Sequence, residues 1–218
     1  MAGLREKKYA RTRLSLVRQL AQAVEKMPWQ DVSIRELCEQ AELSEATFFN
    51  YFPQKQDLLQ LVIQLWLLEI SGQLKSAGAE SGLKRIHAQF ALCAQTCRDR
   101  PGFMHAVIHW VAGGGKLNDQ FAPSMIERQL TFPDDENLKD APVVGLDRLL
   151  ADQLDVAVST GQLPVNTVIP VVLTGLLSLL FGLPLILLGS DPGRISVLYQ
   201  QQLQIYLAGL QTVSQSAA

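Results

Sequence analysis

Hydrophobic residues recur along most of the chain at the three- and four-residue spacing of amphipathic helices. Between Ala10 and Met27 they form a single stripe, and Pro28 ends the helix that this stripe predicts. The same spacing predicts further helices over 57–74, 83–99, 102–112, 143–160 and 192–213. No segment shows the two-residue period of a strand, so the chain is predicted to be all-α.

Two short helices are predicted close together near the N-terminus. Ser33 is a good N-cap with Glu36 three residues later, as in a capping box, and it starts the first helix. Ser44 starts the second helix, which ends at Pro53. Only two residues separate these helices, and a longer helix precedes them. This arrangement predicts a helix-turn-helix.

The second short helix has an unusual mixture of aromatic and polar residues. Four of the five positions from Phe48 to Phe52 are aromatic, next to Ser44, Thr47 and Asn50. A helix-turn-helix accounts for this mixture, because one face of its second helix packs inward while the other enters the major groove of DNA. The residues predicted to contact DNA are Arg35, Ser44, Glu45, Ala46, Thr47, Phe49, Asn50, Tyr51 and Lys55.

Three of these residues have a predicted chemical role. Thr47 can donate to a phosphate and present its methyl group to a thymine, and Asn50 can pair with a base edge. Lys55 begins the next helix, where its charge is suited to a phosphate.

Composition and charge fit a globular protein with a local basic region. The 218 residues are 48% hydrophobic with a net charge of −2. Residues 1–18 nevertheless hold six basic side chains and one acidic side chain, which is either a nucleic-acid-binding arm or a solvated terminus. Three cysteines are too few for a disulfide framework, and no secretory signal is visible, so we expect a cytoplasmic protein.

The stretch VSIRELCEQAELSEATFFNYFPQKQDLL, residues 32–59, resembles the DNA-binding signature of the TetR (tetracycline-repressor-like) family of regulators. Together with the basic arm and the preceding helix, the resemblance covers roughly residues 8–62. It implies a three-helix DNA-binding domain over 1–56 and a larger helical domain for effector binding and dimerisation over 57–218. It also implies a homodimer that binds double-stranded DNA and a small-molecule effector.

The chain departs from the family pattern at a few positions. Glu42 stands in the turn where the family usually has Gly, and a left-handed conformation there would cost Glu about 1 kcal/mol relative to Gly. Phe49 stands where Tyr is common, which removes a hydroxyl that reaches phosphate. Cys38 stands where Ala is common and is expected to be a small buried residue.

The resemblance alone assigns effector binding to the C-terminal part, where no specific motif occurs. The candidates are large or polar side chains of the middle helices, and ordinary core packing is the alternative for each. They are Trp66, Phe90, Phe103, His105, His109, Trp110, Phe121 and Met125. Their apolar bias favours a hydrophobic or aromatic effector.

The segment from Thr167 to Leu188 is almost wholly apolar, and no charged residue occurs from Val156 to Ser190. Its length permits a membrane span, but Pro170 and Pro184 argue against one. We instead expect it to join the last helix in a four-helix dimer interface, as the family implies. The predicted interface residues are Leu173, Leu176, Leu177, Leu180, Leu198, Leu203, Tyr206 and Leu210.

Metal binding and catalysis have little support. Cys93 and Cys97, like His105 and His109, have the four-residue spacing of one helix face, but neither pair has a recognised zinc-binding pattern. No phosphate-binding loop, GxSxG or HExxH motif occurs. We expect no metal site, no cofactor and no enzymatic activity. The alternative function is a small-molecule or metal-binding helical protein, membrane-associated through 167–188 or soluble, whose helix-turn-helix is an interaction module.

Overall fold

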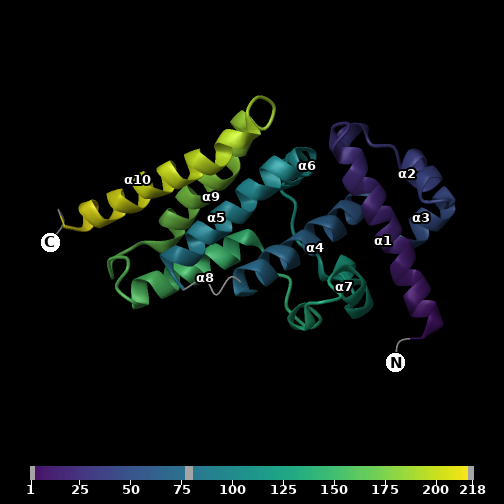
Figure 1. Cartoon of the computed structure of the whole chain (residues 1–218), viewed down its shortest axis with the longest axis horizontal. Helices are drawn as coiled ribbons and strands as arrows, with labels where there is room; N and C mark the ends of the chain where they lie inside the picture. The colour runs from purple at the N-terminus through teal and green to yellow at the C-terminus, as the bar shows by residue number, and fades with distance from the viewer. Residues whose placement is uncertain (1–2, 77–80, 216–218) are drawn as a thin grey trace. The chain divides into compact units, whose positions relative to one another are not determined.

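The structure, a computed structural model, describes residues 3–76 and 81–215, with side chains through residue 210, and within these ranges it contains helices and no strands (Figure 1). The all-α prediction is confirmed. The helices are α1 Leu4–Val24, α2 Ile34–Gln40, α3 Glu45–Tyr51, α4 Lys55–Ser76, α5 Leu83–Asp99, α6 Pro101–Ala112, α7 Met125–Thr131, α8 Leu146–Ser159, α9 Ile169–Leu187 and α10 Ile195–Gln215. Short 3-10 helices are η1 Trp29–Asp31, η2 Asp119–Phe121, η3 Glu136–Leu138 and η4 Pro192–Arg194.

The chain divides into two compact units. Unit 1 comprises Met1–Gly72 and His105–Val143, and unit 2 comprises Gln73–Met104 and Val144–Ala218. The sequence-based boundary between residues 56 and 57 lies within the first turn of α4, and this division stays a prediction. The small-residue stretch over 76–82, whose composition predicts a loop or boundary, falls largely on residues 77–80, which lie outside the described residues.

Helix α1 begins earlier than the hydrophobic stripe predicts. It starts at Leu4 rather than near Ala10, because charged residues with good helix propensity precede the stripe. The basic residues of the N-terminal arm are therefore helical. The C-terminal end agrees with the prediction to within a few residues, since the helix stops at Val24, before Pro28.

The core of unit 1 around the helix-turn-helix is made of side chains that the pattern places inward. Leu14 and Leu20 of α1 are buried with Leu37 of α2. Phe48 of α3 and Phe52, which follows that helix, have no exposed surface. Helices α2 and α3 pack on each other, and α1 packs on α2 and on α7. The three-helix arrangement expected of a helix-turn-helix is present.

Residues 132–141 are mostly acidic and polar, a composition typical of a surface loop, yet part of this stretch is buried. It contains η3, and Leu138 and Ala141 are buried in a small cluster with Leu68 of α4. Asp134, Glu136 and Asp140 stay exposed, so the stretch is polar in composition although two of its apolar residues are buried.

Unit 2 is a bundle in which α5 packs on α8 and α10, and α9 packs on α8 and α10 (Figure 1). The predicted helix over 83–99 agrees with α5 at both ends. Helices α9 and α10 approach closely at Gly175, where an added Cβ atom would lie 2.1 Å from the hydroxyl of Tyr206. The buried hydroxyl of Tyr199 donates to the carbonyl of Leu180 at 2.5 Å, a second tie between these helices.

Candidate nucleic-acid interface

The turn between α2 and α3 is formed by a residue in a left-handed conformation. Glu42 has φ +56°, the only positive φ of a non-glycine residue among the described positions. Leu43 N donates to the carbonyl of Cys38 at 2.9 Å, and Glu42 N donates to that of Glu39 at 3.2 Å. This is the Schellman pattern, which normally has Gly where Glu42 stands. The turn keeps its shape without Gly, at the expense of backbone strain.

Helix α3 separates its aromatic residues between two faces. Phe48 and Phe52 point inward and are fully buried, whereas Phe49 is 48% exposed. Asn50 is also exposed, as are Glu45 and Ala46 one turn earlier. Residues 45, 46, 49 and 50 thus form one exposed face, which we call the reading face. It offers an acceptor, a small side chain, an aromatic ring and an amide.

The N-terminus of α3 is fixed by its own hydroxyl groups. The Ser44 hydroxyl accepts from Thr47 N at 3.1 Å and lies 2.8 Å from the Thr47 hydroxyl. This cap orients the first turn of α3, the part that a helix-turn-helix directs toward base edges.

Tyr51 lies beside α1 rather than on the reading face. Its ring centroid is 4.8 Å from that of Tyr9, with the rings tilted by 58°. Both side chains are at least partly accessible, so Tyr51 holds the end of α3 against α1 while its edge stays exposed.

Lys55 was predicted to hold a phosphate, but its ammonium group has three acceptors within the chain. It donates to the carbonyls of Trp29 at 3.0 Å, Gln30 at 3.1 Å and Val32 at 2.8 Å. It also lies 4.4 Å from the centroid of the Trp29 ring. Partial burial lowers the pKa of Lys55. All three ammonium hydrogens are used, so a phosphate contact would require Lys55 to give up one of these bonds.

Arg35 of α2 is exposed and pairs with an acidic residue of its own helix. Its Nε lies 2.9 Å from the Glu39 carboxylate, and this hydrogen bond raises the pKa of Arg35. The guanidinium therefore remains charged and accessible at the surface of the helix-turn-helix.

A basic groove of about 650 Å³ lies along α1. Lys7, Lys8 and Arg11 line it, together with Ala41 and Leu43 at the turn before α3. The N-terminal arm thus brings positive charge next to the helix-turn-helix, where phosphate groups of a bound duplex would be neutralised.

The predicted effector-binding residues are spread over both units. Phe90 and Phe103 are buried in unit 2, and Trp66 and Phe121 are buried in unit 1. Trp110 packs against Gly115, whereas His105, His109 and Met125 are exposed in unit 1. Phe90 lines a cavity of about 280 Å³ between α5 and α10, with His87, Ser196 and Gln200 as its polar residues. The assignment of these residues to effector binding stays a prediction.

The predicted dimer-interface residues lie partly inside unit 2. Leu176, Leu180 and Leu203 are buried within the unit. The remaining five, Leu173, Leu177, Leu198, Tyr206 and Leu210, are half-buried. Burial raises the pKa of Tyr206, whose hydroxyl donates to the Val172 carbonyl at 3.3 Å.

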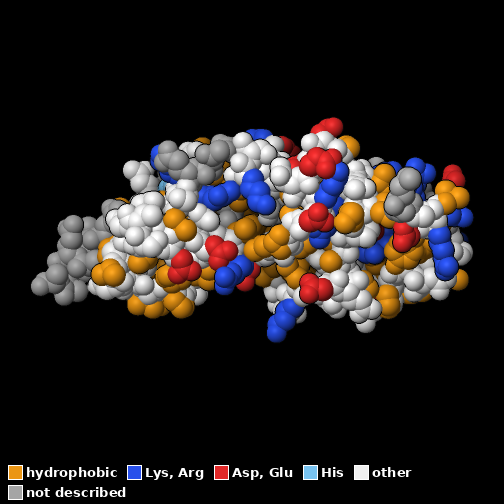
Figure 2. Space-filling model, turned by 90° about the horizontal axis from the view of Figure 1, so that it is seen from below, with side chains coloured by type: hydrophobic (Ala, Val, Ile, Leu, Met, Phe, Trp, Pro, Cys, Tyr) orange, Lys and Arg blue, Asp and Glu red, His pale blue; other side chains and the backbone are white. Residues whose placement is uncertain are grey.

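Other apolar side chains of unit 2 are more exposed than the predicted interface residues. The exposed residues on α9 and α10 are Val171, Leu185, Ile186, Val197 and Ile205. Figure 2 shows hydrophobic side chains reaching the surface at the left of the view, the side on which α8, α9 and α10 lie in Figure 1. Helix α9 is long and apolar enough to cross a membrane by length and composition, with a mean hydropathy of 2.3, and 22% of it is buried.

The cysteine and histidine pairs do not converge on a metal site. Cys93 and Cys97 are buried in α5, and burial raises the pKa of Cys97 to about 12 and that of Cys93 further still. Cys38 is buried as expected. Within the part of the chain that the structure describes, no group of three or more His, Cys, Asp or Glu side chains is placed to hold a metal ion.

Two residues that the sequence did not single out are central to unit 1. Arg13 was counted only as part of the basic arm, yet it is 6% exposed and pairs with Glu127 of α7, which has no exposed surface. Two signals were available. Arg13 occupies the same helix face as Ala10, Leu14 and Leu20, and Glu127 follows Ser124 at the spacing of a capping box.

Comparisons with known proteins agree with this geometry. Residues 21–62, which span the end of α1 through the first part of α4, match the family described as "Bacterial regulatory proteins, tetR family". Among solved structures, Salmonella enterica GusR superposes with a TM-score of 0.54 over 92% of this chain and 95% of its own, at 17% sequence identity. This likeness extends the shared fold beyond the helix-turn-helix. A search of curated proteins found no sequence match.

Proposed function

We propose that this chain is a transcriptional regulator that acts as a homodimeric, ligand-responsive repressor. The match of residues 21–62 to the tetR family of bacterial regulatory proteins supports the regulatory role. Two copies of α3 would read the two halves of a near-palindromic operator in the cytoplasm. A small effector would release the DNA. The observation that carries the proposal is the reading face of α3, with its exposed Asn50 and Phe49 beside the basic groove of α1.

The chemistry of the reading face supports sequence-specific contact. Asn50 has the amide that pairs in two hydrogen bonds with adenine, and Glu45 has the carboxylate that accepts from cytosine. Ala46 is small enough for a close approach of the helix to the base edges. The phosphate contacts fall to Lys7, Lys8 and Arg11 of the groove, which supply affinity rather than sequence preference.

Dimerisation is supported by the exposed apolar side chains of unit 2. Val171 and Leu185 on α9 and Ile205 on α10 are each more than half exposed. Exposed apolar residues on neighbouring helices favour an association that covers them. A symmetric pair of these helices would place the same residues of both copies in contact.

The effector is proposed to be small and largely apolar. The aromatic residues of the middle helices and the cavity beside Phe90 support this chemistry. The effector can release DNA only if it binds the DNA-free form more tightly than the DNA-bound form.

The proposal is tested by selection from random duplexes. The purified full chain is incubated with a pool of random DNA at moderate salt, and the bound duplexes are sequenced. Enrichment of an inverted repeat supports a dimeric sequence-specific regulator and supplies the probe for an effector screen. Binding that is salt-sensitive and enriches no sequence contradicts it.

One observation favours a second candidate, a membrane-associated form. Helix α9 meets the length and composition of a membrane span, and only 22% of that stretch is buried. High-speed centrifugation of the full chain without detergent separates the candidates. A soluble dimer stays in the supernatant, whereas a membrane-associated protein sediments or requires vesicles or detergent to stay dispersed.

A further inference from the structure

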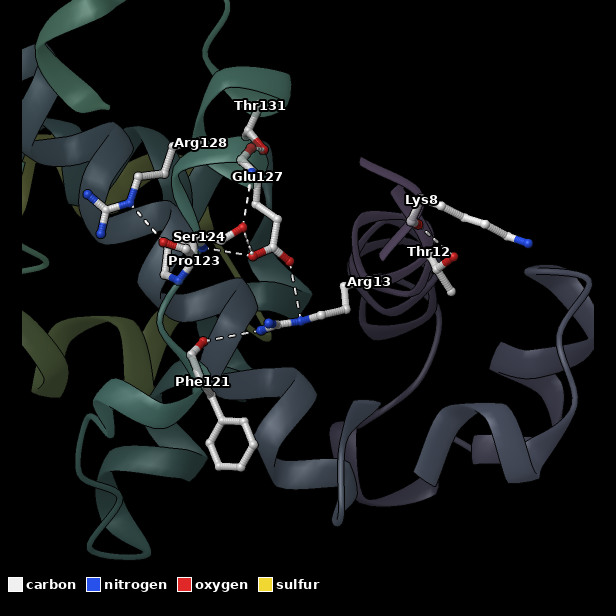
Figure 3. Close-up of polar contacts among 9 residues, drawn as sticks. All are labelled: Lys8, Thr12, Arg13, Phe121, Pro123, Ser124, Glu127, Arg128 and Thr131. Atoms are coloured by element: carbon white, nitrogen blue, oxygen red, sulfur yellow. Dashed lines mark hydrogen bonds and ion pairs between the residues drawn. The ribbon is translucent and has the colours of Figure 1, made fainter. Parts of the chain in front are cut away.

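A single buried arginine connects α1 with α7 inside unit 1. Arg13 of α1 reaches Glu127 of α7, with 3.2 Å between Arg13 Nε and Glu127 Oε1, and it donates from a terminal nitrogen to the Phe121 carbonyl at 3.5 Å (Figure 3). The side chains are 7% and 0% exposed, respectively. The Nε–Oε1 contact is an ion pair without the alignment of a hydrogen bond, so charge attraction holds the two groups together.

The Arg13 guanidinium also lies close to the end of α3, which we call the reading helix. Its central carbon lies 5.1 Å from the centroid of the Phe52 ring and 5.6 Å from that of Tyr9. Phe52 is the C-cap of α3, and Tyr9 packs with a tilted ring against Tyr51, the last residue of α3. Arg13 therefore touches, directly and through Tyr9, both residues that end the reading helix.

Glu127 is held in place from its own helix. Ser124 donates to Glu127 Oε2 through its backbone N–H at 2.7 Å and through its hydroxyl at 2.8 Å (Figure 3). Glu127 N donates back to the Ser124 hydroxyl at 3.3 Å, which completes a capping box. One carboxylate oxygen is thus fixed by the start of α7, and the other is left for Arg13.

A buried ion pair of this kind contributes more to geometry than to stability. The removal of two charges from water offsets most of their attraction, so an apolar pair of similar volume is often as stable. An apolar pair would lack both the attraction to the fixed Glu127 carboxylate and the contacts of the guanidinium with the Phe52 and Tyr9 rings. The pair is therefore suited to fixing where α3 lies relative to α7.

We infer that Glu127 is a positioning residue for DNA recognition, acting through Arg13 on Phe52 and Tyr51 to set the placement of the reading helix. The inference rests on the proposed function, because it assigns α7 a part in reading DNA although α7 lies outside the residues that match the tetR family. A shift of α7 would move the guanidinium and with it the end of α3. A second hydrogen bond joins the N-terminal helices to the later part of unit 1, between Gln30 of η1 and Nδ1 of His109 on α6 at 3.0 Å. It is exposed to water and therefore constrains the N-terminal helices less than the buried pair does.

The test uses the double variant Arg13→Met/Glu127→Met beside the single variant Glu127→Gln. The single variant leaves Arg13 buried without a charged partner, so its melting temperature falls. The double variant removes both charges and should melt close to the wild type. Operator affinity should nevertheless be about tenfold weaker in both variants, because both lose the ion pair between Arg13 and Glu127.

The matched control is Arg128→Met. Arg128 is also an arginine of α7 bonded to carbonyls, those of Pro123, Lys139 and Ala141, but its guanidinium points away from α1 (Figure 3). It should lower the melting temperature while operator affinity, measured well below that temperature, stays within about twofold of the wild type. A double variant that recovers both stability and affinity would show a purely structural pair and overturn the inference.

A second readout does not depend on an operator. Amide hydrogen exchange should be faster over residues 45–52 in the double variant and unchanged in α2. If residues 45–52 exchange as in the wild type, the inference is wrong whatever the DNA result. If they exchange faster but the wild-type protein selects no DNA sequence, the proposed function fails and the positioning contact stands.

Discussion

Helices α3 and α9 each leave one face uncovered, and the two faces differ in chemistry. The reading face of α3 presents a carboxylate, an amide, a methyl group and one aromatic ring. The exposed residues of α9 include Val171, Leu185 and Ile186, and the helix has no charged residue. A polar, mixed face suits a hydrogen-bonding and anionic partner, whereas a mainly apolar, uncharged face suits another apolar surface. Under the proposed function, DNA contacts α3 and a second copy of the chain covers α9.

The largest expected effect concerns the apolar face. Replacing Val171 and Leu185 with Glu places two charges per copy in the proposed interface, where burial without a partner is strongly unfavourable. We expect dimerisation to weaken at least about 100-fold. Sedimentation analysis over a concentration series measures this. The control is Leu130→Glu, an exposed apolar residue of α7 in unit 1, which should leave the dimer intact. A double variant that stays dimeric at the same concentrations would place the interface elsewhere.

The next effect concerns the polar face. Asn50→Ala removes the amide of the reading face and leaves the core unchanged, because Asn50 is exposed whereas Phe48 and Phe52 are the buried residues here. Operator affinity should fall about 10- to 100-fold while the melting temperature stays unchanged. Fluorescence anisotropy with the selected duplex measures the affinity. Gln204→Ala, an exposed amide on α10, serves as the control, and equal losses in both variants would contradict a specific role for α3.

Variants of Lys55 and Lys8 compare a lysine bonded within the chain with a lysine proposed to contact DNA. Lys55→Met removes three carbonyl contacts and should lower the free energy of unfolding by about 2 kcal/mol, with no change in the salt dependence of nonspecific DNA binding. Lys8→Met should do the reverse and reduce the slope of log K against log salt by about 0.9. Urea unfolding and salt titrations give both quantities. A reduced slope in Lys55→Met would restore the phosphate contact predicted from the sequence.

Two glycines sharpen the difference between the faces of α9. Gly175→Ala introduces a methyl group against the Tyr206 ring and should lower the free energy of unfolding by about 1–2 kcal/mol. Gly182→Ala adds the same group where nothing lies within 4 Å, and it should stabilise the helix by up to about 1 kcal/mol. Denaturant unfolding compares the two variants. Similar losses in both would mean that the α9 and α10 helices are not in close contact at Gly175.

The smallest effect is at the turn that positions the reading face. Glu42→Gly removes the strain of the left-handed conformation, which favours folding, but Gly also gives the unfolded chain more entropy, which opposes folding. The net result should be a rise of about 0.5–1 kcal/mol in the free energy of unfolding. Glu42→Ala removes the same charge and keeps the strain, so it should be near neutral. If both variants stabilise equally, the charge of Glu42 and not its backbone is the cause.

The helix-turn-helix was largely predictable from sequence because its determinants are local. Ser33 and Ser44 cap the helices that follow them, and Pro53 lies just beyond α3, each acting within a few residues. Glu42 was also expected to need a left-handed conformation if it stood in the turn, and it has one.

The orientation of α9 was not predictable, because a helix that is apolar all round carries no pattern to show which side faces inward. The structure buries Leu176 and Leu180 and leaves Val171 and Leu185 exposed, a choice made by packing against α8 and α10. The pairing of Arg13 with Glu127 escaped for a related reason. The two residues are far apart in the sequence, and each has an ordinary local explanation, as part of a basic arm and as a helix-capping residue.

The most direct measurement is native mass spectrometry of the full chain with the duplex selected from the random pool. The account predicts a complex of two chains on one inverted repeat, and one chain or none on a duplex that keeps a single half-site. Equal binding to the inverted repeat and to a shuffled duplex, or a single chain on the full repeat, would contradict it.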